Sequence, residues 1–212
     1  MESDFSHIMQ GSVKDPNATE YYSQIMDATL MQKHVSMYNI ETSVNNCMRC
    51  PLNEFVKPLS LGNGVGTSHL MVIGDSPTDV LSQYEGGSLI HSLLEQFQYN
   101  RDYIHFTSLV KCVGSTNYMD CHNHIVAEII AKQPKVIIAL GYNAAYPFMN
   151  HIANAVGQQL VPGAGYTLEN GSDMIVVNHP KDIISNVGLL EELKNHLTMA
   201  FNHLSNKVAV GV

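Results

Sequence analysis

The chain has 212 residues, of which 45% are hydrophobic and only 14% are charged, and its formal net charge is −8. This length suits one domain of ordinary size, with or without an appendage, and the hydrophobic share is sufficient for a buried core. The negative balance argues against a protein coated with positive charge for binding nucleic acid, although it is compatible with a local basic cleft on an acidic body.

Targeting signals are not evident in the sequence. No run of about 18 apolar residues occurs, so we expect no membrane-spanning helix. The amino-terminal MESDFSHIMQ is acidic and lacks the basic-then-apolar pattern of a signal peptide. We therefore expect a cytoplasmic protein, associated with the nucleoid, or with the host cytoplasm if the Asn- and Met-rich composition reflects a viral source. Disulfides are rare in such compartments, where clustered cysteines indicate metal binding or catalysis.

Residues 1–40 are expected to form a helical amino-terminal extension. Turn residues open the segment DPNATEYY, and apolar side chains then recur at helical spacing at Tyr22, Ile25, Met26 and Leu30. We interpret this helix as packing on the main body. The alternative is an arm that docks on a protein partner.

The main body, over residues 41–205, alternates apolar strands with helices and ends in a short tail, 206–212. Its strands lack polar alternation, and helical stretches separate them, which is typical of a parallel sheet covered on both faces. We therefore predict an α/β fold, a three-layer αβα arrangement around a mostly parallel four-stranded sheet. The four predicted strands are 69–74, 102–112, 135–141 and 173–180. The predicted helices are 87–97, 122–134, 142–157 and 188–204.

Polar residues follow the carboxyl ends of these strands, where ligands bind in open α/β sheets. The turns concerned read GDSP, VKC, LGYN and NHP, at residues 74–77, 110–112, 140–143 and 178–180. The architecture alone therefore selects these turns as candidate sites.

The chain has four cysteines, which form two local pairs. Cys47 and Cys50 have the C-x-x-C spacing of a metal knuckle, whereas residues 113–120 separate Cys112 from Cys121. Four thiolates suit tetrahedral zinc or an iron–sulfur cluster, and the unequal spacing weakens the zinc-ribbon interpretation. Unrelated buried thiols, or mixed ligation with the histidines after the last cysteine, are the alternatives. A thioredoxin-like redox pair is disfavoured because proline follows CMRC directly and no helix begins there.

Five segments together carry a resemblance to one known family. They match its C-x-x-C-x-L opening, its glycine-rich stretch leading to G-E-A-P-G, its T-N-V-V-K-C strand, the helix and strand after its fourth cysteine, and its H-P motif. The corresponding segments here are CMRCPL, LGNGVGTSHLMVIGDSP, FTSLVKC, CHNHIVAEIIAKQPKVIIALGYNA and VVNHPKDI. Over about residues 44–198 the chain thus resembles the iron–sulfur uracil-DNA glycosylases, family 4 of that superfamily, as a divergent member.

The resemblance implies an enzyme of base excision repair. Such an enzyme flips a uracil from single- or double-stranded DNA and hydrolyses its N-glycosidic bond, leaving an abasic site. The resemblance also implies a structural [4Fe-4S] cluster, with zinc as its competitor. Its ligands would be Cys47, Cys50, Cys112 and Cys121.

The resemblance assigns the chemistry to two residues. Asp75 stands where the family has a glutamate and would orient water or support the sugar cation; otherwise it is a polar cap, with Ser76, at a strand-to-helix turn. His179 matches the H-P histidine and would donate to the departing uracil anion; otherwise it is a satisfied polar group before a proline. The residues implied for the base pocket are Gly74, Ser76, Pro77, Leu89 and Ser108.

Contacts with the DNA backbone are implied at the LGNGVG loop and at the segment HPKDIISNVG, whose amides and lysine would meet phosphates. Glycine turns that serve only packing are the alternative. The residues implied to bind DNA are Gly64, Gly66, Pro180 and Lys181.

The sequence departs from the family at the base pocket. Ser108 stands where the family places an asparagine that pairs with uracil, and a hydroxyl cannot present donor and acceptor side by side as an amide does. The segment EGGSLIHSLL lacks the stacking phenylalanine, whose loss costs about 1–3 kcal/mol, and Leu89 or Tyr84 would have to substitute. The loop VGSTNYMD, which lies near DNA in the family, is shortened. These departures favour two alternatives: a catalytically impaired DNA-binding or replication/repair-complex subunit, or a glycosylase for another damaged base.

Overall fold

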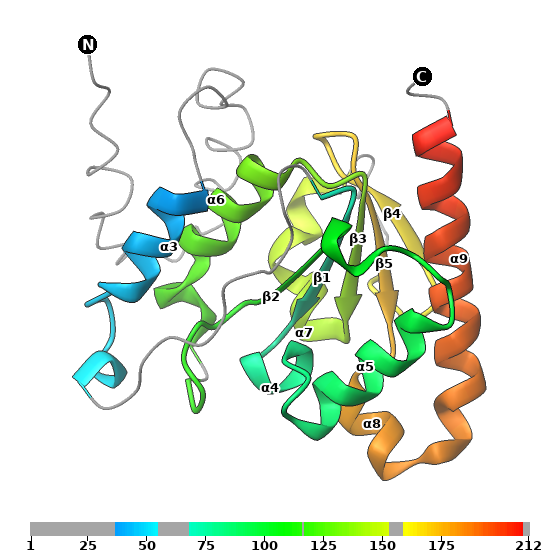
Figure 1. Cartoon of the computed structure of the whole chain (residues 1–212), viewed down its shortest axis with the longest axis horizontal. Helices are drawn as coiled ribbons and strands as arrows, with labels where there is room; N and C mark the ends of the chain where they lie inside the picture. The colour runs from blue at the N-terminus through cyan, green and yellow to red at the C-terminus, as the bar shows by residue number, and fades with distance from the viewer. Residues whose placement is uncertain (1–36, 55–67, 116, 153–158, 210–212) are drawn as a thin grey trace.

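The computed structural model describes residues 37–54, 68–115, 117–152 and 159–209 (Figure 1). Its centre is a five-stranded sheet with the strand order β2-β1-β3-β5-β4. Four of the strands are parallel, and β4 pairs antiparallel with β5 at one edge. The strands are β1 (Leu70–Gly74), β2 (Ile104–Ser108), β3 (Val136–Leu140), β4 (Gly165–Thr167) and β5 (Asp173–Val177).

The predicted mixed α/β fold with a mostly parallel sheet is confirmed, but the predicted number of four strands is wrong. The missed strand, β4, has only three residues, and its burial pattern is exposed, buried, exposed. It lies in the segment VPGAGYTLENG, whose proline and glycines are typical of turns. An edge strand needs a partner on one side only, so a segment this short forms where β5 offers its free edge.

Helices cover both faces of the sheet because successive strand residues point to opposite sides. In β1, Leu70 and Val72 join the core under α5 and α9, while Met71 and Ile73 join the core under α6. Figure 1 shows α9 and α6 on opposite sides of the strands. The helices of four or more residues are α3 (Met37–Asn45), α4 (Pro77–Val80), α5 (Glu85–Glu95), α6 (His122–Lys132), α7 (Tyr142–Ala145), α8 (Pro180–Ser185) and α9 (Leu190–Ala209).

Short 3-10 helices lie in the connections between these elements. They are η1 (Pro51–Glu54), η2 (Arg101–Tyr103), η3 (Tyr118–Asp120), η4 (Tyr146–His151) and η5 (Val187–Leu189). The helix predicted for 142–157 is therefore split into α7 and η4, and Pro147, at the start of η4, lacks the N–H that a continuous helix would use.

The boundaries of the predicted extension and tail fall inside helices. Of the extension, residues 1–36 lie outside the described residues, and α3 crosses the boundary at residue 40. This helix buries Ile40 and Val44 and packs against α6. At the other end, α9 continues past residue 205 to Ala209. None of the helices in the described ranges is long and apolar enough to cross a bilayer.

Candidate active site at the carboxyl edge of the sheet

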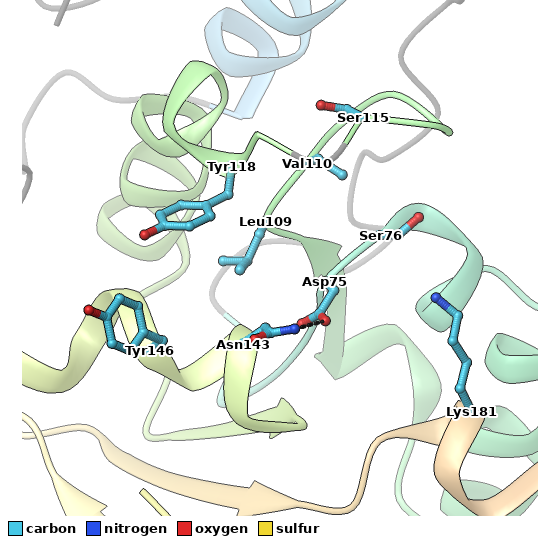
Figure 2. Close-up of a pocket in the computed structure, with 9 residues that line it drawn as sticks. All are labelled: Asp75, Ser76, Leu109, Val110, Ser115, Tyr118, Asn143, Tyr146 and Lys181. Atoms are coloured by element: carbon cyan, nitrogen blue, oxygen red, sulfur yellow. Dashed lines mark hydrogen bonds between the residues drawn. The ribbon is translucent and has the colours of Figure 1, made fainter. Parts of the chain in front are cut away.

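A pocket lies where the parallel strands β1, β2 and β3 end. Its volume is about 400 Å³, which falls within the usual range for small-molecule sites. Figure 2 shows the side chains around it, with two tyrosines at one end and a lysine at the other. The lining residues are Asp75, Ser76, Leu109, Val110, Ser115, Tyr118, Asn143, Tyr146 and Lys181.

Asp75, the residue after β1, is the carboxylate of this pocket. Its Oδ2 accepts a hydrogen bond of 3.0 Å from Asn143 Nδ2 (Figure 2). Burial raises the pKa of Asp75, and the Asn143 hydrogen bond and the nearby His179 oppose this only in part. Among the described residues, the buried Asp75 Oδ1 has no hydrogen-bond partner. A buried acceptor without a partner is costly, which favours a role in binding water or substrate.

A second carboxylate, Asp79, lies behind the pocket and caps α4. Asp79 Oδ2 accepts from Ser76 N at 2.9 Å, and Ser76 Oγ accepts from Thr78 N at 3.4 Å, which makes a capping box. Burial alone would raise the pKa of Asp79, but the His179 ring and the Ser76 N–H outweigh burial and lower the pKa. Ser76 and Asp79 thus cap α4, and Asp75 does not.

His179 is the N-cap of α8 and faces both carboxylates. Its Nδ1 accepts a hydrogen bond of 3.1 Å from Lys181 N, so a neutral ring carries its proton on Nε2. His179 Nε2 lies 3.4 Å from Asp79 Oδ2 and 3.7 Å from Asp75 Oδ2. The Asp79 carboxylate is thus the nearer partner of this nitrogen, and the same contact lowers the pKa of Asp79. The site therefore places a histidine nitrogen, held at 3.4 Å and 3.7 Å from two carboxylates, beside the unpartnered Asp75 Oδ1.

Gly141 allows the His179 ring to lie against the end of β3. Its φ is +93°, and a Cβ there would lie 3.0 Å from both Cβ and Cδ2 of His179. Only a residue without a side chain tolerates this conformation and this approach.

Lys181 brings positive charge to the end of the pocket opposite the tyrosines (Figure 2). Its side chain is 67% exposed, and Nζ lies 3.7 Å from Asp79 Oδ1. An exposed ammonium on this rim suits a phosphate contact. Pro180, the first residue of α8, is buried.

The other residues implied for the base pocket do not line it. Ser108 is fully buried, and its hydroxyl donates to Val110 O at 2.6 Å. Leu89 packs against the core under α5 and α9. Gly74 allows Asp79 to approach, since a Cβ at Gly74 would lie 2.8 Å from Asp79 Cβ. Pro77 is buried at the start of α4. The implied DNA contacts Gly64 and Gly66 lie outside the described residues.

Sequence reasoning missed Tyr118, Tyr146, Asn143 and Asp79. Asn143 lies in the LGYN turn, which its place at a strand end had marked as a candidate site. Nothing in the sequence indicated its contact with Asp75. Asp79 had a signal too, since S-x-x-D at the start of a helix matches a capping box with aspartate in place of glutamate. The two tyrosines carried no signal.

Folding brings the four cysteines toward one another. Cys47 follows α3 and Cys121 precedes α6, so the packing of α3 on α6 draws the first pair toward the second. Burial raises the pKa of Cys112, and Cys50 and Cys47 raise it further. Burial likewise raises the pKa of Cys121 to about 11, with added contributions from Cys47 and Cys112. All four are free thiols.

The identity of these donors fits a group that takes thiolate ligands. However, in the described ranges no three His, Cys, Asp or Glu side chains stand at a geometry that would hold a metal ion. A histidine also approaches the cysteines, with His124 Nε2 3.5 Å from Cys47 Sγ.

A buried ion cluster, consisting of His105, Thr107, Lys111 and Glu128, lies between β2 and α6. Lys111 Nζ lies 2.8 Å from Glu128 Oε1 and donates to Thr107 Oγ1 at 2.6 Å. Glu128 Oε2 accepts from Thr107 Oγ1 and lies 3.3 Å from His105 Nε2. Burial alone would raise the pKa of Glu128, but Lys111 and His105 outweigh it and lower the pKa to about 2. The cluster holds the segment that carries two pocket residues and Cys112.

In sequence, the chain matches no protein-family model and no curated protein. The geometry of the site and the motifs of the chain therefore carry the functional argument.

Proposed function

We propose that this protein is a DNA glycosylase that flips uracil from DNA and hydrolyses its N-glycosidic bond. One observation carries the proposal: Asp75, whose buried Oδ1 has no hydrogen-bond partner among the described residues, lines the pocket, and His179 Nε2 lies 3.7 Å from Asp75 Oδ2. Hydrolysis of an N-glycoside needs an acceptor or negative charge near the sugar and a donor near the departing base. These two atoms supply one of each.

The proposed reaction assigns a role to each group. The C1′–N1 bond breaks and its electron pair leaves with the base as an anion, which His179 Nε2–H stabilises. Water adds to C1′, and Asp75 stabilises the sugar cation and accepts the proton that the water loses. Lys181 contacts a phosphate beside the flipped nucleotide. The products are the free base and an abasic site.

We also propose that Cys47, Cys50, Cys112 and Cys121 hold a [4Fe-4S] cluster. The supply of four thiols and the packing of α3, which precedes the first cysteine pair, against α6, which follows Cys121, support this, and zinc is the competitor. When bound, the cluster would be structural and would fix the loop before β1 to the loop after β2. Purified protein should be brown with about four irons per chain; colourless protein with a single zinc ion would contradict the cluster.

A second candidate is a DNA-binding or replication/repair-complex subunit without catalysis. The burial of Ser108, which removes the family's base-reading position from the pocket, favours it. In that case a protein partner would dock on the amino-terminal extension.

Abasic-site formation on single- and double-stranded oligonucleotides that hold one uracil tests the main proposal. We expect cleavage by wild-type protein and a loss of at least about 100-fold in His179→Ala, as expected for removal of one group that stabilises developing charge. No cleavage by protein with its full complement of iron would favour the binding subunit.

A further inference from the structure

The pocket contains an amide that the sequence resemblance does not assign. Asn143, the second residue of α7, stands on the β3 side of β1, whereas Ser108 ends β2 on the other side. Since Ser108 is buried and its hydroxyl is used by Val110 O, it cannot meet a base in the pocket. Asn143 is exposed and lines the pocket. An amide is therefore present, but it follows β3 and not β2, and these two strands flank β1 on opposite sides.

Asp75 fixes the orientation of this amide. Asn143 Nδ2 donates to Asp75 Oδ2 at 3.0 Å, and a flipped amide would place its Oδ1 against the carboxylate. Among the described residues, the Asn143 side chain makes this one hydrogen bond. Its second N–H and its Oδ1 can therefore bind a ligand. The fixed amide can accept from a ring N–H and donate to an adjacent carbonyl. Uracil presents that edge, whereas cytosine presents a ring acceptor and an amino donor.

Tyrosine rings line the end of the pocket beside this amide. Tyr118 and Tyr146 face the space over Leu109, and Lys181 lies at the far end, with Asp75 between (Figure 2). Tyr146 is 46% exposed, and its ring centroid lies 5.6 Å from that of Tyr142, which is 47% exposed. Exposed aromatic rings on a pocket wall suit stacking with a base.

We propose that the target nucleotide lies across this pocket with its base against Tyr118 and Tyr146. Asn143 reads a base edge that offers N–H beside C=O, Asp75 faces the sugar, and Lys181 meets the phosphate. Base recognition thus lies on the β3 side of the sheet. The inference rests on the proposed function for its nucleotide substrate, but it concerns binding and is measurable without catalysis.

Ligand-observed NMR with dUMP and dCMP tests the binding mode. With wild-type protein we expect saturation transfer to the base protons of dUMP, and much less to those of dCMP. Tyr146→Leu and Asn143→Ala should each weaken dUMP binding about tenfold, and Tyr146→Phe should keep it because the ring is retained. The matched controls are Tyr38→Leu and Asn195→Ala, exposed residues of α3 and α9, which should bind as wild type does.

The outcomes separate the inference from the proposed function. Binding of dUMP that depends on Asn143 and Tyr146, without cleavage of uracil in DNA, would support the inference and contradict the glycosylase. Uracil excision that survives both Asn143→Ala and Tyr146→Leu would overturn the inference and leave the glycosylase standing. A larger loss in Ser108→Ala than in Asn143→Ala, or equal binding of dUMP and dCMP, would also overturn it.

Discussion

The buried ion cluster and the strand-end site use the same kinds of side chain in opposite ways. Each combines a carboxylate, a histidine and a lysine. In the buried cluster Glu128 Oε1 lies 2.8 Å from the Lys111 ammonium, Oε2 accepts from Thr107 Oγ1, and the side chain has no exposed surface. At the strand ends the Asp75 side chain is 25% exposed, and its Oδ1 has no partner among the described residues.

The difference shows which carboxylate is structural and which is available for chemistry. The surroundings of Glu128 favour its charged form and lower its pKa, so it stays an anion that stabilises the fold. The surroundings of Asp75 disfavour its charged form and raise its pKa. A carboxylate that is held in an unfavourable state beside a pocket is a candidate functional group.

The largest expected effect is on stability, from breaking the buried cluster. Glu128→Leu leaves the Lys111 ammonium buried without its counter-ion, which should lower the free energy of unfolding by about 3–5 kcal/mol. Urea unfolding followed by circular dichroism measures this. In the double variant Glu128→Leu/Lys111→Met, most of the loss should be recovered because neither charge remains. A single variant as stable as wild type would show that the cluster does not stabilise the fold.

The next effect is on activity, from removing the charge at the pocket. Asp75→Asn keeps the shape of the side chain but cannot accept a proton or support the sugar cation. We expect uracil excision to fall about 100-fold or more, with the far-ultraviolet circular dichroism spectrum unchanged. In wild type the rate should fall in acid at a pH above the ordinary aspartate value of about 3.9, because the raised pKa protonates Asp75 earlier. Undiminished excision by Asp75→Asn would exclude this carboxylate from the reaction.

The charged forms of the two carboxylates should change the free energy of unfolding in opposite directions, which the pH dependence of stability will show. The lowered pKa of Glu128 means that its stabilising contribution is present above its ordinary value of 4.5 and is lost as the pH falls toward about 2. The raised pKa of Asp75 means that its charged form destabilises the folded chain as the pH rises through that pKa. Asp75→Asn should therefore be slightly more stable than wild type at neutral pH, with the gap closing in acid. Urea midpoints over a pH series measure this, and a less stable Asp75→Asn at neutral pH would reverse the assignment.

The elements of the sheet could be predicted from sequence because their signal is local. The apolar runs of β1, β3 and β5 are continuous, and the helices between them are long enough to show their period. Strand β4 could not be predicted, since its pairing depends on the free edge of β5 rather than on its own pattern. The strand-end rule placed Asp75 and His179 at the same edge before their distance was known.

The contacts of the site could not be predicted because they depend on which strands are neighbours. Asn143 meets Asp75 only because β3 pairs with β1, and nothing in the LGYN turn specifies that order. Glu128 appears in the sequence as one polar residue of a helix, and its partners come from β2 and from Lys111, just after this strand. Ser108 shows the reverse case: it ends β2, directly before the pocket residues Leu109 and Val110, but its own side chain turns into the protein.

The smallest effect concerns Ser76, which serves both the fold and the pocket. Ser76→Ala removes the oxygen that accepts from Thr78 N but keeps the backbone N–H that holds Asp79. Loss of such a cap should cost about 1 kcal/mol of unfolding free energy, whereas Ser92→Ala, at an exposed position within α5, should cost nothing measurable. Because Asp79 keeps its hydrogen bond, His179 should keep its place and uracil excision should change less than twofold. A large loss of excision without a loss of stability would show that the Ser76 hydroxyl contacts the substrate directly, and the strand-end site would then extend to the first turn of α4.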